Sequence, residues 1–186
     1  MIPQKSISVI ISTYNQGRFL NKSLSSVLSQ TRPADEIIVV DSASSDNTPK
    51  IFFHITKSLP KKIQRRIKFK RLKENLGPAR TFNTGLGLAS SDYIIFLPAD
   101  DWYHPQILEK QAEILDKNPK IGAVYCQAYT VADGKKTLKV AKPAGTKTVV
   151  GRNEFERLLT QGDFIPLLTL MTTTKILKQL GGWDEN

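Results

Sequence analysis

Two adjacent carboxylates, Asp100 and Asp101, follow shortly after the apolar run Tyr93–Leu97. Mg²⁺ and Mn²⁺ prefer oxygen ligands, and such ions are commonly held by one or two carboxylates together with the phosphates of a substrate. This spacing therefore allows a divalent-cation site. It equally allows a structural role, in which Asp101 caps a helix beginning near Pro105 and Asp100 is solvated. The residues alone leave both interpretations open.

Polar clusters also end two earlier apolar runs. Ser12-Thr13-Tyr14-Asn15 closes the first, and a Ser/Asp/Asn-rich turn from Asp41 to Asp46 closes the second. Ligands of open parallel sheets bind outside the carboxyl ends of the strands, so these clusters are expected to share one rim. Asp41 could instead be a turn residue that hydrogen-bonds its own backbone, and Tyr14 could either stack on a base or cover the sheet edge.

Other nucleotide-binding motifs are incomplete. Gly85-Leu86-Gly87 is only part of a dinucleotide fingerprint and falls late in an expected helix, which argues against NAD binding. No glycine-rich loop ends in Gly-Lys-Ser/Thr, which argues against a P-loop enzyme.

The elements that would carry these residues alternate between strand and helix. Unbroken apolar runs such as Val9–Ile11 are typical of strands covered on both faces, and a strand followed by a helix and another strand indicates parallel pairing. The sequence therefore predicts an α/β fold with a mostly parallel sheet flanked by helices. The expected strands are Ile7–Thr13, Glu36–Asp41, Ile67–Leu72 near the sheet edge, Tyr93–Leu97 and Ile121–Val131.

The character of the chain changes after about residue 132. Asp133-Gly134 is a hairpin signal, a helix is expected near Asn153–Leu159, and Leu167–Thr174 resembles a further strand. We expect this part to elaborate the same sheet. The division is thus 1–132 and 133–186 within one domain.

Length and composition exclude several classes of protein. The chain has 186 residues, of which 40% are apolar, enough to form a core. No apolar run approaches the roughly 20 residues of a membrane-spanning helix, and no signal peptide is expected at the start. The single cysteine, Cys126, lies in an apolar stretch, so we expect it to be buried and the protein to be cytoplasmic.

The net charge of +10 is concentrated in one segment, residues 57–73. This segment contributes nine basic residues and no acid. It contains one aromatic residue, Phe69, and no nucleic-acid recognition motif, so no nucleic-acid partner is expected. The remaining interpretations are a solvated surface and a surface that docks on an anionic membrane.

Five sequence blocks in order resemble the family-2 glycosyltransferases, which are inverting, nucleotide-sugar-dependent enzymes of the GT-A fold. The resemblance covers nearly the whole chain and implies a Rossmann-like, nucleotide-sugar-binding sandwich. The blocks are Ser8–Asn15, EIIVVDSASSDNT from Glu36, ENLGPARTFNTGL from Glu74, DYIIFLPADD from Asp92 and GGWDEN from Gly181.

The resemblance also implies roles for individual residues. Thr13, Tyr14 and Asn15 match the loop that lines the nucleoside pocket, and Asp41 matches an acid that contacts the base or ribose. Asn83 and Asp100 complete the implied set. Asn83 matches an asparagine beside the donor pocket, and Asp100 matches the last acid of the metal motif, where it would hold Mg²⁺ or Mn²⁺ on the diphosphate. Such a cation stabilises the charge that accumulates on the departing diphosphate.

The chain departs from the family pattern in three places. Pro98 replaces the first acid of the metal motif, and Phe82 stands where an arginine is common, although Arg80 lies two positions earlier. The general base usually lies in a later acidic motif. We therefore expect the base beyond residue 186 and the chain to be truncated, with Asp184 and Glu185 the only nearby acids.

The implied function is transfer of a sugar from a nucleoside-diphosphate sugar, with a UDP-sugar favoured, to a hydroxyl of a glycan or lipid-linked acceptor. Such a metal-dependent enzyme would serve glycan or cell-surface polysaccharide synthesis, and segment 57–73 would hold it at the inner face of the membrane. The alternative is a nucleotide-sugar-binding module without turnover.

Overall fold

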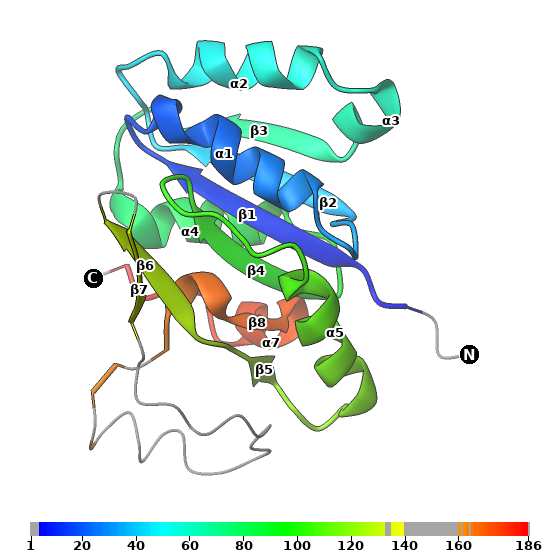
Figure 1. Cartoon of the computed structure of the whole chain (residues 1–186). Helices are drawn as coiled ribbons and strands as arrows, with labels where there is room; N and C mark the ends of the chain where they lie inside the picture. The colour runs from blue at the N-terminus through cyan, green and yellow to red at the C-terminus, as the bar shows by residue number, and fades with distance from the viewer. Residues whose placement is uncertain (1–3, 133–134, 140–159, 161, 164, 186) are drawn as a thin grey trace.

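A six-stranded sheet forms the centre of the fold in the computed structural model, which describes residues 4–132, 135–139, 160, 162–163 and 165–185 (Figure 1). Its strand order is β3-β2-β1-β4-β8-β5. The strands β1 to β4 are mutually parallel, and β8 is antiparallel to both of its neighbours. The bounds are β1 Ile7–Thr13, β2 Glu36–Asp41, β3 Ile67–Arg71, β4 Tyr93–Pro98, β5 Ala123–Val124 and β8 Met171–Thr173. The predicted α/β fold with a mostly parallel sheet is confirmed.

Helices cover both faces of this sheet. In Figure 1, α1 crosses in front of β1 and α4 lies behind the sheet. The helices are α1 Gly17–Leu28, α2 Thr48–Lys57, α3 Lys61–Gln64, α4 Gly77–Leu88, α5 Ile107–Lys117 and α7 Thr174–Gln179, with a short 3₁₀ helix η1 at Leu167–Thr169. No helix in the described ranges is long and apolar enough to cross a membrane.

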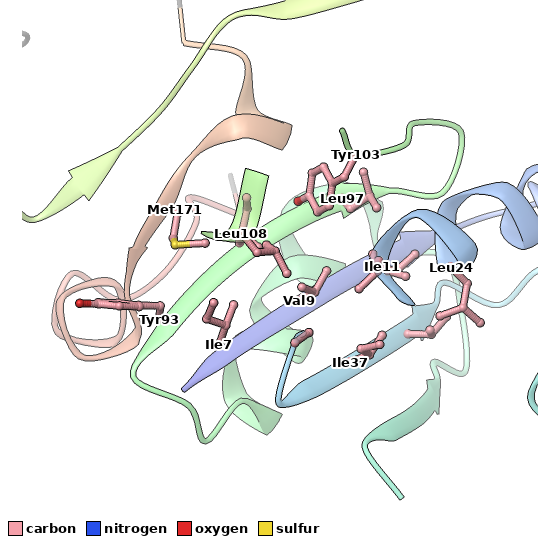
Figure 2. Close-up of a cluster of buried hydrophobic side chains, with 14 of the residues drawn as sticks. Ile7, Val9, Ile11, Leu24, Ile37, Tyr93, Leu97, Tyr103, Leu108 and Met171 are labelled. Carbon is pink, nitrogen blue, oxygen red and sulfur yellow. The ribbon is translucent and has the colours of Figure 1, made fainter. Parts of the chain in front are cut away.

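Alternate residues of β1 enter two different hydrophobic clusters. Val9 and Ile11 pack with Leu24 of α1 and Leu108 of α5 (Figure 2), whereas Ile10 packs on the opposite face against α4. All of these side chains are fully buried, which contributes about 1.5–3 kcal/mol for each large side chain. Burial on both faces explains why the central strands lack polar alternation.

The expected strand Ile121–Val131 is wrong, because this stretch forms two separate strands. β5 ends at Val124, and β6 Ala128–Ala132 pairs with β7 Lys135–Lys139 in a second, two-stranded sheet. Between them, the Thr169 hydroxyl accepts a hydrogen bond from the Cys126 N–H and donates one to its carbonyl. These bonds replace the strand ladder, and they leave Cys126 exposed rather than buried.

Of the other elements expected in the second half of the chain, one strand is present and the rest fall outside the described residues. Leu167–Thr174 contains the short strand β8, preceded by η1. The turn Asp133-Gly134 and the helix at Asn153–Leu159 fall outside the described residues, although the strands on either side of that turn do pair as a hairpin.

Asp101 does not cap the following helix. That helix, α5, begins at Ile107. Its N-cap residue Gln106 forms no side-chain cap, and the Leu108 N–H in the first turn donates a hydrogen bond to Oε1 of Gln30 instead. The carbonyl groups of His104 and Pro105 are instead held by the Gln30 side chain and the Thr31 N–H, so this loop is fixed by contacts with the end of α1.

Gly85 allows α4 to approach β1 closely. A Cβ atom at Gly85 would lie 2.3 Å from Cγ2 of Ile10, whereas one at Gly87, two residues later, would meet no atom within 4 Å. We expect Gly85→Ala to destabilise the fold by about 1–3 kcal/mol through overpacking. Gly87→Ala should stabilise it by about 0.5–1 kcal/mol, because alanine loses less backbone entropy in a helix.

Chemical denaturation of the two variants and of the unsubstituted chain measures this difference. Equal stability of the Gly85 and Gly87 variants would show that α4 is not packed against Ile10 as described.

Candidate functional site

A pocket of about 420 Å³ lies at the carboxyl ends of β1 and β4. The loop after β1, the first turns of α4, Pro98 of β4 and η1 all contribute to its wall. Tyr14 and Phe82 supply aromatic surface, and Thr13 supplies a hydroxyl. The lining residues are Ser12, Thr13, Tyr14, Gln16, Ser42, Asn75, Gly77, Pro78, Thr81, Phe82, Pro98 and Leu167.

The register of the sheet brings the strand ends together at this edge. Thr13 pairs with Asp41 across β1 and β2, and Ser12 pairs with Pro98 across β1 and β4. The side chains that follow these strands therefore share one rim, as the sequence predicts.

Asn15 joins the loops after β1 and β2. Its side-chain oxygen accepts hydrogen bonds from the N–H groups of Ser45, at 2.8 Å, and Asp46, at 3.2 Å. Asn15 (φ 53°) and Ala43 (φ 60°) both adopt left-handed backbone conformations. Such conformations cost about 1–3 kcal/mol in a non-glycine residue and persist only where the surroundings hold them, commonly at functional sites.

Asp41 is fully buried, and its two carboxylate oxygens differ. Oδ1 accepts hydrogen bonds from the Ser44 backbone and hydroxyl, which is the turn role that the sequence allowed. Oδ2 has no hydrogen-bond partner among the described residues, and the nearest cation is Nε of Arg71 at 3.5 Å. The Thr13 hydroxyl on the neighbouring strand is likewise buried without a partner. Because such atoms are costly to bury unpaired, they are suited to meet a ligand.

The two carboxylates of the acidic pair after β4 differ in exposure. Asp100 is exposed and Asp101 half-buried. Burial, assisted by the neighbouring charge of Asp100, raises the pKa of Asp101. No group of three or more His, Cys, Asp or Glu side chains able to hold a metal occurs in the described part of the chain. Two carboxylates fit a divalent cation that takes its other ligands from phosphates and water.

Asn83 is not among the residues that line this pocket. Its amide forms hydrogen bonds with the backbone of Trp183 and the side chain of Glu185. Of the six residues expected to bind nucleotide, the structure places Thr13 and Tyr14 in the pocket wall. Asn15, Asp41, Asn83 and Asp100 lie outside that wall, the first three within hydrogen-bonded networks of the protein.

Three residues at this edge of the sheet, Arg71, Asn75 and Leu167, were not predicted from the sequence as part of the site. Arg71 ends β3 opposite Asp41, so the strand-end rule applied to the third strand would have found it. Asn75 accepts hydrogen bonds from the Ser42 hydroxyl and the Gly77 N–H, which shapes the entry to α4. Leu167 reaches the pocket from η1, far along the chain, and no local signal marks it.

A larger hollow of about 670 Å³ lies near the amino end of β4, with Lys5, Lys175 and Lys178 in its wall. It contains no aromatic residue, and Lys178 is already bound to the Ala89 carbonyl. The smaller pocket combines aromatic surface with an unpaired buried hydroxyl, so we take it as the candidate site.

The sequence pattern of Glycosyl transferase family 2 matches residues 8–175. The chain belongs to this family. An uncharacterized glycosyltransferase of Nostoc is 33% identical over 142 residues, covering 76% of this chain and 42% of the relative. Poly(ribitol-phosphate) beta-N-acetylglucosaminyltransferase TarP of Staphylococcus aureus is 39% identical over 108 residues, covering 56% and 31%.

Solved structures of glycosyltransferases share the fold. Staphylococcus aureus TarS 1–349 matches with a TM-score of 0.74 at 22% identity, covering 97% of this chain and 51% of TarS 1–349. The mannosyltransferase PcManGT of Pyrobaculum calidifontis matches with a TM-score of 0.71 at 22% identity, covering 100% and 49%. The expected GT-A fold is confirmed. The chain spans about half the length of these proteins.

Asp46 holds the β2–α2 loop against the start of α1. It accepts hydrogen bonds from Thr48 and from the Gly17 N–H. Partial burial opposes ionisation, but these hydrogen bonds outweigh it and lower the pKa of Asp46. A lowered pKa means that the carboxylate stabilises the fold above its unfolded pKa of about 3.9 and loses this effect as the pH falls through the folded value.

We therefore expect Asp46→Asn to lower the thermal unfolding midpoint at pH 7, with the difference from the unsubstituted chain closing below about pH 4. Glu74→Gln, at an exposed position, serves as the control and should change stability by less than about 0.5 kcal/mol at either pH. A difference that grows on acidification would contradict this assignment.

Proposed function

We propose that this chain forms the donor-binding part of an inverting, metal-dependent glycosyltransferase. The pocket at the strand ends would take the nucleoside of a nucleoside-diphosphate sugar, with a UDP-sugar favoured. The sugar would pass to a hydroxyl of a glycan or lipid-linked acceptor during cell-surface polysaccharide synthesis. The observation that carries this proposal is the pocket itself, where the aromatic surface of Tyr14 and Phe82 adjoins Thr13, whose buried hydroxyl has no hydrogen-bond partner among the described residues.

The dimensions and chemistry of the pocket suit a nucleoside. Its volume of about 420 Å³ falls within the range of small-molecule sites. Tyr14 is 45% exposed and can stack on a base. The Thr13 hydroxyl can donate or accept a hydrogen bond, and Oδ2 of Asp41, which is ion-paired with Arg71, would accept one from a base N–H or a ribose hydroxyl. Asn15 would keep the loop that presents Tyr14 in place.

Asp100, with Asp101 beside it, would hold the divalent cation. When bound, Mg²⁺ or Mn²⁺ neutralises charge on the departing diphosphate. Pro98 stands where the family commonly has a further acid, so the chain itself would supply few ligands and the diphosphate would supply others.

The names and ligands of related proteins support the proposed transfer of a sugar from a nucleotide sugar. TarS structures contain UDP and UDP-GlcNAc, and the PcManGT structure contains GDP-Man and Mn²⁺. Other relatives are named poly-beta-1,6-N-acetyl-D-glucosamine synthase and putative teichuronic acid biosynthesis glycosyltransferase. These products are cell-surface polysaccharides.

Transfer of the sugar also needs a general base that deprotonates the acceptor hydroxyl. Glu185 is a poor candidate, because its two oxygens are engaged by Asn83 and Arg80. We place the base beyond residue 186, with Asp184 as the alternative within the chain. The alternative function that we consider is nucleotide-sugar binding without turnover.

The basic segment 57–73 would dock the protein on the inner face of the membrane. Lys68 and Arg71 are paired with Glu36 and Asp41. Lys61, Lys62 and Arg65, on and just after α3, are exposed. Phe53 of α2 is 57% exposed and adds apolar surface to the same region. Each free basic residue would contribute about 1 kcal/mol on an anionic membrane.

Calorimetry with UDP, GDP and dTDP in the presence of Mn²⁺ tests donor binding. We expect binding of at least one nucleotide, and we expect Asp100→Ala to weaken it by about tenfold or more and to remove its dependence on Mn²⁺. The control Glu113→Ala changes an exposed acid on α5 and should bind normally. Absence of binding to all three nucleotides would contradict the proposed function, and unchanged binding by Asp100→Ala would contradict the metal site.

Sedimentation with vesicles tests the membrane proposal. We expect the chain to bind phosphatidylglycerol vesicles and not phosphatidylcholine vesicles. The combined variant Lys61→Glu, Lys62→Glu and Arg65→Glu should bind about a hundredfold more weakly. The control Lys110→Glu, Lys117→Glu and Lys120→Glu changes the net charge equally at another surface. Equal loss in both combined variants would rule out a specific docking face.

A further inference from the structure

The Asn83 side chain of α4 forms three hydrogen bonds with the turn Gly181–Glu185. The oxygen of its amide accepts a hydrogen bond from the Trp183 N–H at 2.8 Å. The amide nitrogen donates to the Trp183 carbonyl at 2.9 Å and to Oε1 of Glu185 at 2.7 Å. Both N–H donors of the amide and its oxygen are thus used within the protein.

The backbone conformation of Gly181 and Gly182, and the absence of a Cβ atom at Gly182, make room for the Asn83 side chain. Gly182 has a φ of +83°, which favours glycine, and a Cβ atom there would lie 2.3 Å from Oδ1 of Asn83. Gly181 also has a positive φ, of +85°. No larger residue could present the Trp183 backbone to the amide in this way.

Glu185 reinforces the attachment. Its second oxygen accepts a hydrogen bond from Nε of Arg80 at 3.0 Å, one turn before Asn83 on α4. Arg80 and Asn83 therefore hold both ends of one carboxylate, and the last described residues of the chain are anchored to α4 by three side-chain groups.

The anchored turn reaches the candidate pocket through aromatic rings. The ring of Trp183 packs against Phe96 of β4, with centroids 5.4 Å apart, and against Phe82 of α4, at 6.1 Å. Phe82 is one of the pocket-lining residues. The path from Asn83 to the pocket thus runs through Trp183 and Phe82, and close-packed rings of this kind transmit small displacements.

We propose that Asn83 is a positioning residue, which sets the shape of the nucleotide pocket through Trp183 and Phe82 without touching the nucleotide. The proposal rests on the proposed function of the pocket, and it assigns Asn83 an indirect role in place of the direct contact that the family resemblance suggests.

Calorimetry with UDP and Mn²⁺ tests this role against a control on the same helix. Asn83→Ala should weaken binding by about three- to tenfold. Thr84→Ala, which removes only a hydroxyl bound to the Arg80 carbonyl, should leave binding unchanged. No binding by the unsubstituted chain would overturn the proposed function and this inference together. Equal affinity of the unsubstituted chain and Asn83→Ala would overturn the inference alone.

Tryptophan fluorescence at saturating UDP separates the coupling between the pocket and Trp183 from the affinity for UDP. The chain has two tryptophans, so Trp102→Phe leaves Trp183 as the only one. In that background we expect UDP to change the Trp183 emission, and the change to disappear when Asn83→Ala is added at saturating UDP. An emission change of the same size with and without Asn83 would overturn the proposal.

A second pair of variants keeps the test valid if Asn83→Ala fails to fold. Asn83→Asp retains the acceptor for the Trp183 N–H but repels Glu185. It should weaken UDP binding, and adding Glu185→Gln, which supplies an amide donor, should restore part of the affinity. Normal binding by Asn83→Asp, or no recovery in the double variant, would overturn the proposal.

Discussion

β1 lies between β2 and β4 and pairs with both in parallel register, with its apolar side chains buried on both faces. A slip of one residue would send Val9 and Ile11 into the α4 side of the core and Ile10 into the α1 side, away from the residues that pack against each of them. The register is therefore strongly specified. It places Thr13 beside Asp41 and Ser12 beside Pro98, so the pocket is a consequence of the core.

The loops at this edge contain features that cost folding free energy, and burial of the hydrophobic core offsets this cost. Asn15 and Ala43 adopt left-handed conformations. The Thr13 hydroxyl and Oδ2 of Asp41 are buried without a hydrogen-bond partner among the described residues, although Oδ2 is ion-paired with Arg71. These features are concentrated where β1 and β2 end. A nucleotide that supplied hydrogen bonds to both unpaired atoms would recover part of their cost, which connects the local strain to the proposed binding.

The sequence predicts the fold more fully than it predicts the site. Runs such as Glu36–Asp41 could be read as buried strands, because burial on both faces leaves an unbroken apolar pattern. The prediction of one strand over Ile121–Val131 was wrong, because Thr169, more than 40 residues later, supplies the hydrogen bonds that interrupt it. The hydrogen-bond partners of Asn83 could not be predicted from the local sequence pattern either, since they lie 100 and 102 residues away along the chain. Side-chain roles set by such distant contacts need the folded chain.

We propose that the nucleoside binds in the pocket at the carboxyl ends of β1 and β4 and that the metal binds at Asp100. A crystal structure of the chain with UDP and Mn²⁺, with the ion located by its anomalous scattering, tests this most directly. We predict the uracil ring beside Tyr14, within hydrogen-bonding distance of Thr13 or Asp41, and the anomalous peak at Asp100. Uridine bound instead in the hollow beside Lys5, Lys175 and Lys178, or a manganese ion away from Asp100, would contradict the account.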